Sequence, residues 1–216
     1  IVNYTVRLEP ISGEQNLANN SYDFSVNVIA EKQRILFLAR GPHPDLSAIS
    51  QALEGINKYE TRLITSFSNE LDFSAYDLVI VHQLPHVDPQ TTDLVDKLLQ
   101  SRRPVLFVVG KETSISGFNG LKTGFQFQPV KGFEQVSAFI QESFSLFRFD
   151  ATEMKRFQDL PPLLAPFGDI DLDSSLELFA NQVIQSVETK RPLIAFGRND
   201  GQKRGFIAGE GLWRWR

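Results

Sequence analysis

Three short loops carry the side chains in this sequence that could take part in chemistry. They read GPHPD at residues 41–45, HQLPH at residues 82–86 and GKETS at residues 110–114, and each follows an apolar run. Their imidazole, carboxylate and amine groups can transfer protons or hold a small ligand. The alternative is that the loops are polar only because surface loops face water. The candidate ligand-binding residues are His43, Asp45, His82, His86, Lys111 and Glu112.

The spacing of the histidines does not predict a metal site. His82 and His86 are four residues apart, like the histidine pairs with which helices bind metals, and His43 is the third histidine. Pro85 argues against a helix here, because the residue before a proline disfavours the helical conformation. The loop at residues 110–114 also lacks the GxxxxGK[ST] spacing of a phosphate loop and the GxSxG spacing of a nucleophile elbow. We therefore expect no metal, no cofactor and no catalytic residue.

Strand patterns and helical patterns alternate in the part of the chain that must position these loops. Strands are predicted at residues 34–40, 59–65, 77–84 and 104–110, and helices at residues 46–56 and 91–101. This alternation is typical of an α/β fold whose mostly parallel sheet is covered by helices on both faces. Ligands of such sheets collect at the carboxyl ends of the strands, which is where the three loops lie.

The second half of the chain is less regular. The patterns predict an edge strand at residues 124–130, a short helix at residues 133–144 and a strand at residues 146–150. Three closing strands are predicted at residues 176–183, 192–198 and 204–211. The last two are joined by NDGQK, whose Asp-Gly pair is typical of a hairpin turn.

Residues 1–31 predict a β-hairpin. Apolar and polar residues alternate on both sides of the turn-forming segment ISGEQNLANNS, as in strands with one buried face. An isolated hairpin is marginally stable in water, so its apolar face needs a partner. That partner is either the following α/β domain or the same hairpin of a second copy. Because missing strands leave open backbone edges, a homodimer through residues 1–31 is the favoured alternative.

Composition and charge exclude several classes of protein. The net charge of the 216 residues is −4 and no run of Lys or Arg exceeds two residues, so we expect no nucleic-acid partner. The absence of cysteine excludes disulfides, thiolate zinc sites and a cysteine nucleophile. No segment has the roughly eighteen consecutive apolar residues of a membrane helix, and the start IVNYTVRLEP does not resemble a signal peptide. The sequence is therefore expected to be a soluble piece cut from a longer chain.

Several of these segments together resemble a known family. RILFLARGPHPD, DLVIVHQLP and PVLFVVGKE resemble a class I glutamine amidotransferase-like domain, and GFIAGEGLWRWR resembles the closing strand and helix start of such domains in large bacterial envelope proteins. Residues 1–31 resemble the last hairpin of an immunoglobulin-like domain. The resemblance implies two domains, a truncated β-sandwich module at 1–31 and an amidotransferase-like domain at 32–216. It implies a flavodoxin-like, doubly wound and mostly parallel sheet for the second domain.

The chain departs from this family at the catalytic positions. The resemblance implies a cysteine in the turn after the strand at 104–110 and a His–Glu pair near the end of the domain. Glu112 stands where the cysteine would fall, and no histidine follows His86. Thiolate attack requires both the thiol and a base close to it. We therefore expect no glutamine hydrolysis and no enzyme activity.

The resemblance also implies a cellular role. It predicts a non-catalytic domain of a membrane-anchored bacterial envelope protein, placed on the periplasmic side and acting in assembly or protein recognition. The partners would be another protein or other domains of the parent chain. The alternative is a hydrolase, or a domain that binds a sugar or nucleotide, with its site in the loops at the carboxyl ends of the strands.

The last residues, WRWR, could contact a partner. Trp213, Arg214 and Trp215 are the candidate partner surface, because aromatic and basic side chains are enriched at protein interfaces. In the alternative interpretation the tryptophans cap the sheet and the arginines face water.

Overall fold

The computed structural model describes residues 2–14, 19–26, 32–67 and 71–215. Its elements are β1 (Val2–Arg7), β2 (Ser21–Val26), β3 (Gln33–Ala39), α1 (Pro44–Glu54), β4 (Tyr59–Ile64), η1 (Phe73–Ala75), β5 (Leu78–His82), α2 (Pro89–Gln100), β6 (Val105–Val109), α3 (Ile115–Asn119), β7 (Phe125–Phe127), β8 (Phe133–Ile140), α4 (Ala151–Gln158), β9 (Leu163–Pro166), β10 (Ile170–Leu172), β11 (Leu176–Ile184), β12 (Val187–Asn199), β13 (Gln202–Ala208) and η2 (Leu212–Arg214). No helix in this described part is long and apolar enough to cross a membrane.

The chain divides into two compact units between Lys32 and Gln33. The predicted domain boundary follows Glu31, which lies outside the described residues. The first unit contains the antiparallel pair β1–β2, with Val2 opposite Val26 and Arg7 opposite Ser21.

The apolar residues of the hairpin gather on one face. Tyr4 and Phe24 are opposite each other, and their rings stack with centroids 5.5 Å apart. This alternation follows from the period of two in a strand, which sends every second side chain to the same face. Tyr4 is 47% exposed and Phe24 is 39% exposed.

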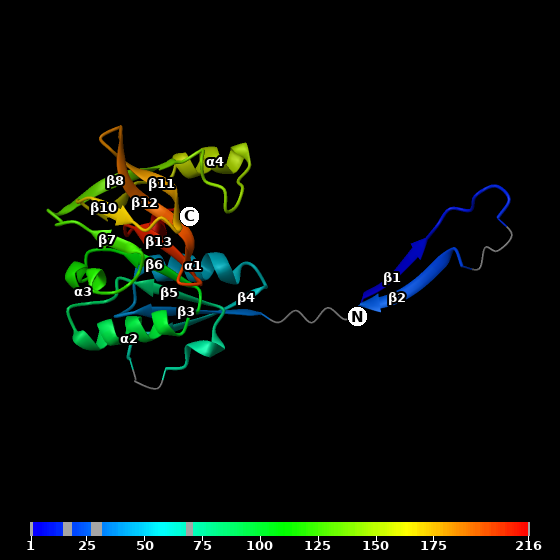
Figure 1. Ribbon diagram of the computed structural model, residues 1–216, viewed down its shortest axis with the longest axis horizontal. Coiled ribbons are helices and arrows are strands. Elements are labelled where there is room, and N and C mark those ends of the chain that lie inside the picture. Colours follow the sequence, from blue (N-terminus) through cyan, green and yellow to red (C-terminus); the bar gives the residue numbers. More distant parts are fainter. Residues whose placement is uncertain (1, 15–18, 27–31, 68–70, 216) are drawn as a thin grey trace. The chain divides into compact units, whose positions relative to one another are not determined.

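The second unit is built on a nine-stranded sheet in the order β4-β3-β5-β6-β13-β12-β11-β8-β9 (Figure 1). The first five of these strands are parallel to one another, whereas the pairings from β13 to β9 are antiparallel. A separate small sheet pairs β7 with β10. The prediction of a flavodoxin-like, doubly wound and mostly parallel sheet is therefore wrong.

Two tight hairpins explain why β12 runs antiparallel to both β11 and β13. Gln185 and Ser186 connect β11 to β12, and both have positive φ angles. Asp200 and Gly201 connect β12 to β13 with φ angles of 50° and 78°. Positive φ at both central residues is the conformation of type I′ turns, which join antiparallel neighbours. The predicted hairpin loop NDGQK is confirmed, but its effect on the direction of the remaining strands was not anticipated.

Two other local predictions in this half are wrong. Residues 133–144 were expected to form a helix, but β8 occupies Phe133–Ile140 and pairs with both β11 and β9. The buried residues of β8 are Val136 and Ile140, and a spacing of four suits one face of a helix as well as one face of a strand. Residues 146–150, expected to form a strand, lie in a connecting segment before α4.

The strands β3, β5 and β6 agree with the apolar runs predicted at 34–40, 77–84 and 104–110. Alternate residues of these strands enter two separate cores, one on each face of the sheet. Leu36, Val79 and Phe107 pack in the core that contains the apolar side of α2. Ile35 and Ile80 pack in the other core, together with residues of α1. The strands read as continuous apolar runs because both faces are covered.

Candidate functional site

The three predicted loops and the segment after β13 meet at the carboxyl ends of four neighbouring parallel strands. These strands are β3, β5, β6 and β13. Their register pairs Ala39 with His82, His82 with Val108, and Val109 with Ala208. The segments that follow these residues therefore leave the sheet at one edge, where ligands of parallel sheets usually bind.

Asp45 is the centre of the first group of polar residues at this edge. It lies in the first turn of α1 and is 0% exposed. The Gly211 amide donates to its Oδ2 at 2.9 Å, and the Trp213 amide donates to its Oδ1 at 3.0 Å. One carboxylate thereby joins the start of α1 to the turn after β13.

Two histidines face the same carboxylate. His82 Nε2 lies 3.5 Å from Asp45 Oδ2, and His43 Nδ1 lies 3.7 Å from it. His43 is the N-cap of α1, and its Nδ1 accepts a hydrogen bond from the Asp45 amide at 3.2 Å. The ring centroids of the two histidines are 4.4 Å apart. The first group is therefore a compact trio of His43, Asp45 and His82.

Burial and nearby charges oppose each other in this trio. Burial lowers the pKa of His43 and the neighbouring His82 lowers it further, against the opposing effects of Asp45 and Glu210. Burial alone would raise the pKa of Asp45, but its interactions with His82 and with the Gly211 and Trp213 amides hold that pKa below the ordinary value. The folded state thus favours a neutral His43 beside an ionised Asp45.

The His82 ring is buried with one nitrogen that makes no hydrogen bond. Its side chain is 3% exposed, and Nε2 is one of three buried side-chain atoms without a hydrogen-bond partner among the described residues. The contact with Asp45 Oδ2 is within ion-pair distance at 3.5 Å, but it is not a hydrogen bond. Buried polar atoms are normally paired, so this nitrogen requires an explanation.

Gln83 organises a second group beside the trio. Its backbone has a φ of 54°, which is uncommon for a residue other than glycine. Its Nε2 donates to Glu210 Oε2 at 2.8 Å, and its Oε1 accepts from the Glu112 amide at 2.8 Å. The Lys111 amide also donates to Glu210 Oε2, at 3.1 Å. A Cβ at Gly110 would lie 2.5 Å from that same oxygen, so glycine permits this close packing.

A third group lies nearer the surface. Arg40 Nη1 is 2.7 Å from His86 Nε2, which is 3.4 Å from Glu112 Oε2. The Glu112 side chain is 67% exposed, so this contact contributes little to stability. Lys111 joins the site through its backbone amide, and the residue is exposed.

The structure therefore brings most of the candidate ligand-binding residues together, but in separate groups. His43, Asp45 and His82 form the trio, and His86 contacts Glu112. Sequence reasoning missed three residues at this edge, which are Arg40, Gln83 and Glu210. The Gly-Glu-Gly sequence directly after β13 is the one signal that could have pointed to Glu210.

The candidate partner surface does not form one surface. Trp213 is 46% exposed, and the Arg214 guanidinium carbon lies 5.9 Å from its ring centroid. Trp215 instead packs edge-on against Phe157 with centroids 5.3 Å apart, and its Nε1 donates to the Pro161 carbonyl at 2.7 Å. Trp213 is thus exposed, whereas Trp215 is only partly exposed.

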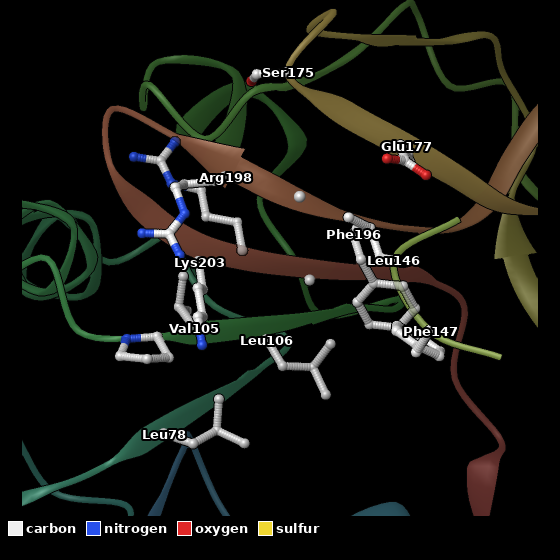
Figure 2. Close-up of a pocket in the computed structure, with 14 residues that line it drawn as sticks. Leu78, Val105, Leu106, Leu146, Phe147, Ser175, Glu177, Phe196, Arg198 and Lys203 are labelled. Atoms are coloured by element: carbon white, nitrogen blue, oxygen red, sulfur yellow. The ribbon is translucent and has the colours of Figure 1, made fainter. Parts of the chain in front are cut away.

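An apolar groove of about 590 Å³ lies at the opposite, amino-terminal end of β6 (Figure 2). Its apolar lining includes Leu78, Val105, Leu106, Leu146, Phe147 and Phe196. Figure 2 shows Arg198 and Lys203 at one end of it and Leu146 with Phe147 at the other. The Ser145 amide and hydroxyl donate hydrogen bonds to the Glu177 carboxylate. These bonds attach the segment that carries Leu146 and Phe147 to β11. No pattern in the sequence predicts this groove.

The chain is similar in fold to several solved structures. The β-galactosidase from Rahnella sp. R3 matches with a TM-score of 0.56 and 12% identity, over 86% of this chain and 30% of that chain. The α-L-fucosidase isoenzyme 2 from Paenibacillus thiaminolyticus matches with a TM-score of 0.55 and 12% identity, over 82% of this chain and 29% of that one. This chain thus spans less than a third of the length of either enzyme.

A glutamine amidotransferase from Thermotoga maritima matches with a TM-score of 0.51 and 12% identity, over 83% of this chain and 76% of that chain. Identities this low show the fold alone. The resemblance to amidotransferase-like domains is therefore supported as a fold. No protein-family model and no curated protein matches the chain.

Proposed function

We propose that this chain is a non-catalytic, amidotransferase-like domain that recognises a protein partner through the apolar groove. The observation that carries the proposal is the composition of that groove, which joins a wide apolar lining to basic residues at one end. Exposed apolar surface bordered by polar residues is typical of protein-binding sites. Leu146 is 50% exposed and Phe147 is 42% exposed, so both can contact a partner without unfolding the domain.

The partner segment is expected to be apolar with acidic residues beside it. Glu177 is already engaged by Ser145, whereas the contact of Arg198 Nη1 with the Gly201 carbonyl is long, at 3.4 Å. The charge available for a partner at the groove is thus mainly that of Arg198 and Lys203. Complementary charge would orient the partner, and apolar burial would supply most of its affinity.

The turn after β6 supports a non-catalytic role. An acyl-transfer site needs a nucleophile and backbone amides that are available to an oxyanion. Here the chain has no cysteine, and three successive amides already bind side chains. The Gly110 amide donates to Thr113 Oγ1, the Lys111 amide to Glu210 and the Glu112 amide to Gln83. We expect no release of ammonia from glutamine, and turnover that is lost in Glu112→Gln would contradict this part of the proposal.

The proposed setting is the periplasmic side of the bacterial cell envelope, within a membrane-anchored parent that carries an immunoglobulin-like domain before residue 32. The sequence resemblance is the support for this setting. Partners would be a second envelope protein or another domain of the parent chain.

A photo-crosslinking residue in the groove tests the recognition role. Placed at Leu146, it should form an adduct with one defined protein of an envelope extract, and Phe147→Asp should abolish the adduct. The matched control is the same residue at Val187, which is 64% exposed and outside the groove lining. Equal adducts from both positions, or none from Leu146, would overturn the proposal.

A small-ligand or hydrolytic site at the carboxyl ends of the strands is the second candidate. The favouring observation is the convergence of His43, Asp45 and His82, which acid–base work or ligand binding would require. A sugar or nucleotide that binds only the folded state should raise the melting temperature. The shift should disappear in His43→Asn and persist in Phe147→Asp. A shift that Phe147→Asp removes would assign the ligand to the groove instead.

A further inference from the structure

We propose that His43, Asp45 and His82 bind a divalent transition-metal ion of the zinc class. The site lies at the opposite end of the sheet from the groove, so the inference does not depend on the recognition role. Neither the helical spacing of the histidines nor any motif predicted it. The three side chains come together because β3 and β5 are neighbours, with Ala39 opposite His82.

The distances among the three side chains suit a four-coordinate ion. Donor atoms bound at about 2.1 Å in a tetrahedron lie about 3.4 Å from one another. Asp45 Oδ2 lies 3.5 Å from His82 Nε2 and 3.7 Å from His43 Nδ1, and all three donor atoms lie within 4.8 Å of one another. Small movements of the rings would therefore bring the three atoms to coordination distance.

The unpaired nitrogen of His82 is independent support. Among the described residues this buried Nε2 has no hydrogen-bond partner, although it lies 3.5 Å from Asp45 Oδ2. A metal ion between the two atoms would satisfy the nitrogen lone pair. Asp45 is already held by the Gly211 and Trp213 amides, and such outer contacts orient metal ligands.

The ligand types select the class of metal. Two imidazoles and one carboxylate suit zinc and its neighbours in the first transition series, whereas magnesium and calcium prefer oxygen ligands. Three protein ligands leave a fourth position for water or a bound molecule. The Glu210 carboxylate, which binds Gln83 and the Lys111 amide at the same edge of the sheet, adds negative charge to this edge.

The ion has a route to the site. The His43 side chain is 30% exposed and borders a cavity of about 300 Å³ along α1. Binding through Nδ1 would replace the hydrogen bond that this atom accepts from the Asp45 amide. His43 is thus the ligand at which the ion enters, and His82 is the buried ligand.

Titration of the purified full chain with zinc tests the inference. We expect one ion per chain, and a cobalt-substituted protein with the intense visible absorption of a four-coordinate site. His43→Asn should weaken binding by at least about 10–100-fold, which is the cost of disturbing even the residues that support metal ligands. Asparagine is a good N-cap, so this variant should keep the start of α1 and remain folded.

His86→Asn is the matched control, because His86 is the remaining histidine and lies outside the trio. It should bind zinc as the parent chain does, while His82→Asn, checked for folding by its circular dichroism, should not. Absence of zinc binding in the parent chain would overturn the inference. Equal weakening by His86→Asn and His43→Asn would also overturn it, since that result describes non-specific binding to histidines.

Discussion

The two ends of the nine-stranded sheet are built in opposite ways. At the carboxyl ends of β3, β5 and β13, polar side chains bind backbone amides of distant segments, and Asp45 is completely buried. At the amino-terminal end of β6, the groove is lined mainly by apolar side chains, several of which are half-exposed. The polar end thus directs its interactions into the molecule, whereas the apolar end leaves half-exposed apolar side chains such as Leu146 and Phe147. Substitutions should therefore cost folding stability at the first end and binding at the second.

Asp45→Ala should have the largest effect on stability. It leaves the Gly211 amide, whose bond to Asp45 is buried, and the Trp213 amide, whose bond is partly buried, without their acceptor, and a buried donor left unpaired costs about 1–3 kcal/mol. We expect the free energy of unfolding in urea to fall by about 2–5 kcal/mol. Glu112→Ala is the control at the exposed part of the same edge and should change it by less than about 0.5 kcal/mol. Similar losses of unfolding free energy in both variants would contradict the expected difference between the buried Asp45 and the exposed Glu112.

Gly197→Ala should have the next largest effect on stability. It is an exception to the expectation that substitutions at the groove affect binding and not stability. Gly197 lines the groove, but its added Cβ would meet the Ser175 carbonyl oxygen and approach Leu176 Cα to 2.8 Å. Backbone cannot move aside cheaply, so a loss of about 1–3 kcal/mol is expected by thermal unfolding. The comparison variant is Gly110→Ala, whose Cβ would meet the side-chain ends of Gln83 and Glu210. A larger loss in Gly110→Ala would show that those side chains are rigid.

The strands of the nine-stranded sheet show how far the sequence predicts the fold. The runs that became β3, β5 and β6 were predictable because each is apolar enough to be buried on both faces. The direction of β11 and β8 was not, because strand direction depends on pairing and not on local composition. β8 was mistaken for a helix because Val136 and Ile140 suit either period.

The candidate site was predictable to a similar extent. His43, Asp45 and His82 were found because they lie at or shortly after the ends of apolar strands. Gln83 was missed because its role depends on a positive φ and on Glu210, which is 127 residues away in the chain. The groove was missed because single residues from several segments line it, and no segment carries a recognisable motif.

A smaller effect is expected from pH, and it should be confined to the polar end. The pKa of His43 is lower in the folded chain than its ordinary value of 6.5. The unfolded chain therefore takes up the proton first as the pH falls. The contribution of neutral His43 is complete above about pH 6.5 and is lost as the pH falls through the folded pKa.

His43→Asn should flatten the stability profile below about pH 6.5 in urea titrations without metal. Asp45 and Glu210 face His43 with negative charge and reduce the size of this effect. The lowered pKa of Asp45 acts in the same direction but only below about pH 4, so the two ranges can be separated. A profile for His43→Asn that still falls between about pH 6.5 and pH 5 would contradict the assignment.

Deletion of residues 1–31 should have the smallest effect on either end of the sheet. The chain divides into compact units after Lys32, so both the trio and the groove belong to the unit that remains. Its melting temperature and zinc binding should stay unchanged. The hairpin has an apolar face with Tyr4, Val6 and Phe24 at least 39% exposed, and full burial of such a side chain contributes about 1.5–3 kcal/mol. We therefore expect light scattering to show a dimer of the full chain that becomes a monomer on deletion. A deletion variant that unfolds would instead make the hairpin part of the core and move the domain boundary.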